Sequence, residues 1–165
     1  MRDVICNTSP LQYLHQADLL HLLPTLFGSV QAPSAVATEL AEGRRRGVCL
    51  PELADLPWVT VRPVSDRKLL PLVTSLGNGE KEVLALGLEM PGHLLVLDDR
   101  NARRYAAAAG LKITGTLGIL VIACMSHHPT VEARDTPAMT SLRLLAVLNV
   151  LFKYACARQA ARASS

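Results

Sequence analysis

Polar side chains with oxygen ligands follow two apolar segments of the sequence, at the point where each segment ends. Asn7 follows the first segment, and Asp98 and Asp99 follow the second. Two further acids, Glu39 and Glu80, lie in segments with helical spacing. Because ligands of an open α/β sheet bind beyond the carboxyl ends of its strands, we expect these side chains to approach one another at one sheet edge.

Carboxylates that converge in this way repel one another unless a cation joins them. Hard divalent cations such as Mg²⁺ and Mn²⁺ prefer oxygen ligands, including carboxylate and amide oxygens. A carboxylate cluster that holds one or two such ions is suited to the in-line hydrolysis of phosphodiesters. The pattern therefore predicts a magnesium or manganese site of a phosphodiester-cleaving enzyme.

Each of these residues also has an ordinary structural explanation. Glu80 in a first helical turn favours the helix dipole, and Asp98 or Asp99 can cap the helix that follows. Asn7 can form an Asx turn, and Glu39 can lie on a solvated helix face. The metal hypothesis therefore depends on the joint placement of the residues rather than on any one of them.

Apolar runs alternate with segments of helical spacing along most of the chain, which predicts an α/β fold: a three-layer α/β/α sandwich with a mostly parallel central sheet. Strands are predicted at residues 4–6, 28–32, 58–61, 94–97 and 112–114. Helices are predicted from Pro10 as the first helical position, over 33–41 with an end at Gly43, and over 80–90, 101–109 and 117–125, with a basic loop at 44–47 and a helical turn at 66–70.

The domain division follows from the same pattern. Residues 1–125 form the α/β domain, and residues 126–165 form a divergent helical segment that we expect to pack on the same domain. Within this segment, residues 142–157 have helical spacing and either join the core or form a dimer or partner surface.

Length and composition exclude several classes of protein. A chain of 165 residues suits one domain, and 50% hydrophobic with 19% charged residues excludes intrinsic disorder. The longest apolar runs, at 117–125 and 144–152, fall short of the roughly 20 residues that span a bilayer, so no membrane association is expected. Four scattered cysteines and the absence of a signal-peptide pattern lead us to expect a cytoplasmic protein with reduced thiols.

The charges are divided unevenly between the two ends of the chain. Residues 1–99 carry 12 acidic and 8 basic side chains, whereas residues 100–165 carry 2 acidic and 9 basic ones. Thirteen of the bases are arginines, which bind phosphate in bidentate fashion. Aromatic residues make up only 4%, so phosphate contacts rather than base stacking are expected to dominate any binding of nucleic acid, and the candidates are Arg44, Arg45, Arg46, Arg100, Arg103 and Arg104.

Four segments in the same order resemble the PIN-domain family, in particular an uncharacterised prokaryotic branch. The resemblance covers residues 2 to about 125. Its segments are Val4-Ile5-Cys6-Asn7-Thr8-Ser9-Pro10-Leu11, Ala32-Pro33-Ser34-Ala35-Val36-Ala37-Thr38-Glu39-Leu40, Gly79-Glu80-Lys81-Glu82, and Leu94–Arg103 followed by Gly110–Gly118.

The resemblance implies a metal-dependent endoribonuclease similar to the toxins of VapBC-like toxin–antitoxin pairs. It implies RNA as substrate, Mg²⁺ or Mn²⁺ as cofactor, a small antitoxin protein as partner, and a homodimer. By position, Glu39, Glu80 and Asp99 match three family acids and become the candidate catalytic residues. Asn7 and Asp98 complete the candidate metal ligands, and Thr8, Glu82 and Thr116 are secondary candidates.

Asn7 is a departure from the family pattern, because many PIN nucleases carry Asp at this position. An amide oxygen still ligates a hard cation but brings no charge, so metal affinity and water activation should fall. The sequence therefore leaves an alternative open: a catalytically weak or inactive PIN-like module that binds RNA or protein.

Overall fold

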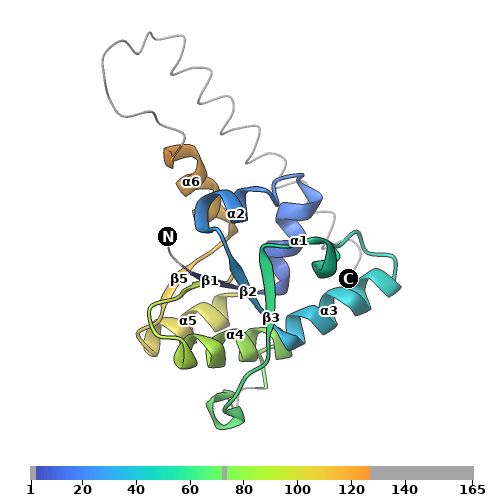
Figure 1. The fold of residues 1–165 in the computed structure, drawn as a ribbon. Helices are drawn as coiled ribbons and strands as arrows, with labels where there is room; N and C mark the ends of the chain where they lie inside the picture. Colours follow the sequence, from blue (N-terminus) through green and yellow to red (C-terminus); the bar gives the residue numbers. More distant parts are fainter. Residues whose placement is uncertain (1–2, 72–73, 127–165) are drawn as a thin grey trace, which may run out of the picture.

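The computed structural model describes residues 3–71 and 74–126, and within them five strands form one parallel sheet in the order β3-β2-β1-β4-β5 (Figure 1). The strands are β1 (Val4–Cys6), β2 (Val30–Pro33), β3 (Val59–Arg62), β4 (Leu94–Val96) and β5 (Lys112–Thr114). The helices are α1 (Thr8–Gln16), α2 (Leu22–Phe27), α3 (Ser34–Arg45), α4 (Asn78–Glu89), α5 (Arg100–Ala108) and α6 (Thr116–Ser126), with 3₁₀ turns η1 (Leu53–Asp55) and η2 (Arg67–Leu69).

Helices cover both faces of the sheet. Helices α4 and α5 pack against the strands from one side, whereas α2 and α6 contact each other and the strands from the other side (Figure 1). The central strand β1 is fully buried, which explains why its sequence is a continuous apolar run rather than an alternating one. The predicted α/β/α sandwich is confirmed, and every strand pair described is parallel.

The strand register brings the ends of β1 and β4 together. Cys6 is paired with Val96, and the backbone N–H of Asn7 donates to the carbonyl oxygen of Val96 at 3.2 Å. The residues that follow these two strands therefore leave the sheet side by side at its carboxyl edge. Helix α3 follows β2, and α4 follows β3. Both helices therefore begin on the side of the sheet where these parallel strands end.

Several predicted helix boundaries were wrong, among them the start of α4, which lies at Asn78 rather than at Glu80. Helix α1 begins at Thr8, with Asn7 as its N-cap, rather than at Pro10. Helix α3 continues through Gly43 to Arg45, so the predicted basic loop is partly helical. At Gly43, the Leu50 side chain occupies the space that a Cβ atom would need. The chain turns later, at Gly47, whose φ of 83° is in the left-handed region.

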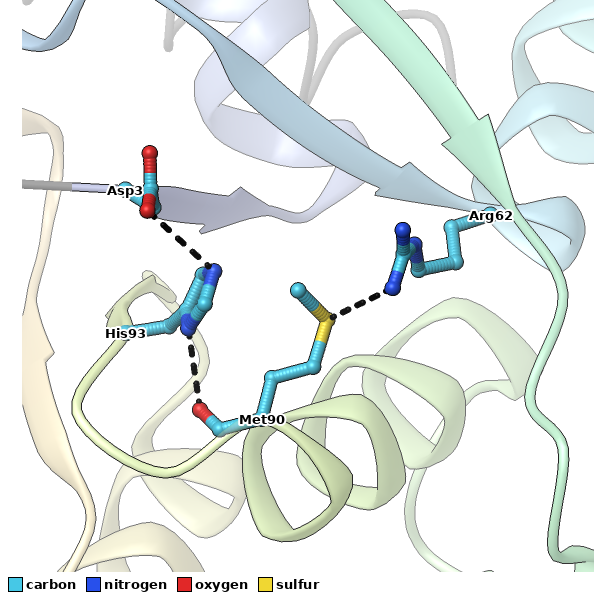
Figure 2. Close-up of polar contacts among 4 residues, drawn as sticks. All are labelled: Asp3, Arg62, Met90 and His93. Atoms are coloured by element: carbon cyan, nitrogen blue, oxygen red, sulfur yellow. Dashed lines mark hydrogen bonds and ion pairs between the residues drawn. The ribbon is translucent and has the colours of Figure 1, made fainter.

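A small polar cluster holds the connection from α4 into β4 (Figure 2). His93 Nδ1 lies 3.0 Å from the carbonyl oxygen of Met90, and His93 Nε2 lies 3.8 Å from an Asp3 carboxylate oxygen. Arg62 Nη1 donates to the Met90 sulfur at 3.8 Å. Since Asp3 and His93 precede β1 and β4, their pair lies at the amino edge of the sheet, away from the candidate ligands.

None of the helices in residues 3–71 and 74–126 combines the length and apolar character of a bilayer-spanning helix. The segment predicted at 126–165 lies, beyond Ser126, outside the described residues.

Candidate active site

Asn7 places an amide oxygen with no hydrogen-bond partner at the carboxyl edge of the sheet. The residue is only 3% exposed, and its side chain makes no cap hydrogen bond with α1. Its Oδ1 atom is buried and unpartnered. The Asx-turn explanation is therefore wrong. An unpaired buried acceptor is costly by about 1–3 kcal/mol and is usually explained by a partner from outside the chain.

Glu39 extends from α3 toward Asn7 rather than into solvent. Its Oε2 accepts from Thr8 Oγ1 at 2.5 Å, and its Oε1 accepts from the backbone N–H of Gly79 at 2.8 Å. A Cβ atom at Gly79 would lie 2.7 Å from Glu39 Oε2 and 2.9 Å from Asn7 Oδ1. The missing side chain of Gly79 thus leaves a cradle lined by the oxygens of both residues.

Helices α3 and α4 cap each other with carboxylates. Their N-cap residues, Pro33 and Gly77, have no side chain that can accept a hydrogen bond. Glu39 of α3 accepts from the Gly79 N–H, and Glu82 of α4 accepts from the Ala35 N–H at 2.7 Å. Glu82 therefore binds the start of α3, the helix that carries Glu39, and is not seen to line the cradle.

We expect Glu82→Ala to destabilise the protein by about 1 kcal/mol, because α3 loses its cap. We expect Mn²⁺ affinity to fall by about 10- to 100-fold, as when a residue that orients a metal ligand is removed. Glu82→Gln keeps an acceptor oxygen and should behave nearly as wild type in both thermal unfolding and calorimetric metal titration. Equal loss of affinity in both variants would instead make Glu82 a direct metal ligand.

Glu80 combines a capping role in α4 with charge coupling to two other acids. Its Oε2 accepts from the Gly77 N–H at 2.8 Å, which closes the first turn of α4. Burial, and then the nearby charges of Asp99 and Glu39, raise the pKa of Glu80, while the Gly77 hydrogen bond opposes the shift. A Cβ atom at Gly77 would lie 3.6 Å from Glu80 Oε2 and 4.0 Å from Glu39 Oε1, so the two carboxylates are neighbours and the first-turn role of Glu80 does not exclude a role in the site.

We expect Glu80→Gln to stabilise the metal-free protein at neutral pH. The raised pKa means that the folded state binds the proton more tightly than the unfolded state, so ionisation of Glu80 weakens folding as the pH rises above 4.5, the ordinary value. Gln keeps the acceptor for Gly77 without the charge. Thermal unfolding in EDTA should show a gain that shrinks as the pH is lowered toward 4.5; a gain that does not change with pH would contradict this explanation.

Asp98 and Asp99 point to different neighbours. Asp99 caps α5 by accepting from the Ala102 N–H at 2.8 Å, so its cap explanation is correct, although it also acts on Glu80. Asp98 accepts from the backbone N–H of Thr116 at 2.9 Å and from its Oγ1 at 2.5 Å. The hydroxyl group of Thr8 thus donates a hydrogen bond to Glu39, and that of Thr116 donates one to Asp98.

Glu39 and Asp98 line two different concavities. Glu39 lines one of about 350 Å³ between α3 and α4, together with Lys81 and Arg67. Asp98 lines another of about 350 Å³, together with Arg103 and Gly115. The two concavities have no described lining residue in common. Asn7 and Glu39 instead meet at Gly79, and charge relates Glu80 to Glu39 and Asp99.

Several of the predicted RNA-binding arginines make contacts within the chain. Arg44 forms an ion pair with Glu52 and donates to the Pro51 carbonyl, and Arg46 forms an ion pair with Glu42. Arg103 donates to the Leu97 carbonyl at 3.3 Å. The side chains of Arg45, Arg100 and Arg104 are exposed.

The acidic side chains do not by themselves form a complete metal site in the described residues. Across residues 3–71 and 74–126, no group of three His, Cys, Asp or Glu side chains is arranged to hold an ion. Cys6 is buried, and burial and then the charge of Asp98 raise the pKa of its thiol, so a reactive thiolate is disfavoured. The unpaired Asn7 oxygen beside Glu39 is the arrangement that fits a hard cation, since Mg²⁺ commonly takes one or two carboxylates and retains water.

Comparison with known proteins agrees with this architecture. The model of the family DUF3368, a PIN domain, matches residues 3–152. The fold is similar to that of a PilT N-terminus domain protein, SSO1118, from the hyperthermophilic archaeon Sulfolobus solfataricus P2, with a TM-score of 0.56, 17% identity, and coverage of 79% of this chain and 99% of that chain. At that identity the likeness concerns the fold alone. No curated protein matches the chain.

Proposed function

Since the chain belongs to the PIN-domain family, whose members are in general metal-dependent nucleases, we propose that it is a divalent-metal-dependent endoribonuclease. The observation that supports this proposal most is the unpaired, buried Oδ1 of Asn7 beside the Glu39 carboxylate. The buried amide oxygens of Gln16 and Gln31 also have no partner, so the feature that favours an ion at Asn7 is the Glu39 carboxylate beside it.

Asn7 and Glu39 would hold Mg²⁺ or Mn²⁺, with Glu80 and Asp99 as the neighbouring acids. A bound ion would supply activation of water and stabilisation of charge on the phosphodiester. The chain's own hydrogen bonds from Thr8 and Gly79 orient the Glu39 carboxylate before any ligand arrives. Each carboxylate oxygen retains a second lone pair, so these bonds leave Glu39 able to act as a ligand.

Incubation of the purified protein with a labelled single-stranded RNA tests the proposal. We expect internal cleavage with Mn²⁺ or Mg²⁺ and none with EDTA. Cleavage that continues in EDTA would exclude a metal-dependent mechanism. The absence of cleavage at millimolar Mn²⁺, with no heat of metal binding by calorimetry, would exclude the nuclease proposal.

A second candidate is a PIN-like module that binds RNA or protein without cleaving it. It is favoured by the neutral Asn7 and by the lack, in the described parts of the chain, of a three-acid group. Such a module would bind RNA in EDTA and would remain inactive at all metal concentrations.

We further propose that the protein is a cytoplasmic toxin of a toxin–antitoxin pair, inhibited by a small partner protein and acting as a homodimer. The resemblance of the four sequence segments supports this narrower role. Co-expression of a small neighbouring reading frame should relieve growth arrest caused by the protein. Growth arrest that the neighbouring protein does not relieve, or no arrest at all, would contradict the toxin role without affecting the nuclease proposal.

A further inference from the structure

A concavity of about 310 Å³ lies between helix α5 and the segment that precedes α4. This volume is at the lower end of the roughly 300–1,000 Å³ typical of small-ligand sites. Its described lining residues are Ser75, Asn101, Arg104, Tyr105 and Ala108. Four of them follow the helical spacing of one face of α5, so a single rigid element presents them together.

The concavity adjoins the candidate site. Asn101 is two residues beyond Asp99, which caps α5. On the other wall, Ser75 is two residues before Gly77, whose N–H binds Glu80. Helices α4 and α5 contact each other, so each wall of the concavity begins within two residues of the turn that starts one of these helices.

The charge of this concavity differs from that of the other two. The concavity that Glu39 lines also contains Glu42 and Glu82, and the third contains Asp98. By contrast, the described lining of the α5 concavity has Arg104 and no carboxylate. An anionic ligand is therefore favoured here, whereas the carboxylates of the two concavities described above are offset only in part by Arg67 and Lys81 in one and are balanced by Arg103 in the other.

Tyr105 adds an aromatic surface to this cationic wall. Its side chain is 44% exposed, although Ala102 and Ala106 of the same helix are buried. An exposed aromatic ring next to an arginine is the combination that single-stranded nucleic acids use, because bases stack on the ring and phosphates pair with the guanidinium. The side chains of Asn101 and Ser75 supply hydrogen-bond donors and acceptors.

We propose that this concavity is a nucleotide subsite for single-stranded RNA, next to the phosphodiester that the candidate acids would cleave. Tyr105 stacks on a base, Arg104 binds a phosphate, and Asn101 and Ser75 contact the base edge or ribose. The position of the subsite relative to cleavage rests on the proposed nuclease function, but RNA binding itself does not.

Equilibrium binding of a fluorescent single-stranded oligoribonucleotide to the full chain in EDTA tests the subsite without cleavage. We expect Tyr105→Ala to weaken binding by about 5- to 100-fold, the range for loss of one stacked base. Tyr105→Phe keeps the ring and should bind within about twofold of wild type, since stacking does not need the hydroxyl group. Arg104→Gln should lower the salt dependence of log K by about 1 unit.

Lys112→Gln is the matched control, because Lys112 is also an exposed cation but begins β5 at the amino edge of the sheet. The subsite is overturned if Tyr105→Ala and Arg104→Gln bind RNA as the control does, if Tyr105→Phe loses as much as Tyr105→Ala, or if wild type binds no RNA. Tyr105-dependent binding by a protein that never cleaves RNA supports the subsite and rejects the nuclease function. Cleavage of RNA that does not depend on Tyr105 supports the nuclease function and rejects the subsite.

Discussion

Glu39→Gln is expected to lower RNA cleavage by about 100-fold or more, because a ligand charge at a catalytic metal contributes several kcal/mol. The fold should remain, since the Gln side chain can still accept from the Gly79 N–H through its amide oxygen. Cleavage rates at saturating Mn²⁺, calorimetric metal titration and thermal unfolding together measure the effect. The substitution should therefore separate chemistry from stability.

Glu42→Gln is a suitable control, because Glu42 lies on the same helix and forms an exposed ion pair with Arg46. Exposed ion pairs contribute only about 0–1 kcal/mol to the free energy of unfolding, so this variant should stay folded and should cleave RNA as wild type does. Equal loss in both variants would point to an unspecific charge effect on RNA binding. Full activity of Glu39→Gln would remove Glu39 from the catalytic residues.

The strands and their shared edge were predictable because burial leaves a direct trace in the sequence. Strand β1 is fully buried, and strands buried on both faces are continuous apolar runs. Once the sheet is parallel, the side chains after β1 and β4 must meet at one edge. The placement of Asn7 near the other candidate residues followed from this rule.

The capping pattern was not predictable to the same extent, because it depends on how two helices pack. Gln or Glu near a helix start usually indicates a cap within that helix, as Glu80 provides for α4. Glu39 and Glu82 instead cap each other's helices, at positions separated by 40 and 47 residues from their partners. The signal in the sequence was the lack of capping side chains at Pro33 and Gly77, which requires acceptors from elsewhere.

The sequence also could not separate Asp98 from Asp99. Both follow β4, and only the direction of each side chain decides whether it caps α5 or binds Thr116. Tyr105 shows a further limit. A low aromatic content argued against stacking as the main RNA contact, yet one exposed ring in a cationic concavity is enough for a single base.

Asn7→Asp is expected to have opposite effects with and without metal. In the metal-free protein, the new carboxylate would be buried beside Glu39 without a partner, and we expect a loss of about 1–3 kcal/mol in the free energy of unfolding. With Mn²⁺, the added ligand charge should tighten binding by about tenfold or more and raise RNA cleavage, because affinity for hard cations rises with ligand charge. Thermal unfolding in EDTA and in Mn²⁺, with calorimetry, measures both effects.

Asn78→Asp is the matched control for this reversal, since Asn78 is exposed in the first turn of α4, where it lines the same concavity as Glu39. It introduces the same charge close to the site without burying it, so it should change neither metal affinity nor metal-free stability by a comparable amount. If Asn7→Asp cleaves RNA where wild type does not, the neutral residue limits an otherwise intact site. If Asn7→Asp lowers stability but leaves Mn²⁺ affinity unchanged, the unpaired oxygen of Asn7 is no metal ligand, and the binding-only module is the better description of this chain.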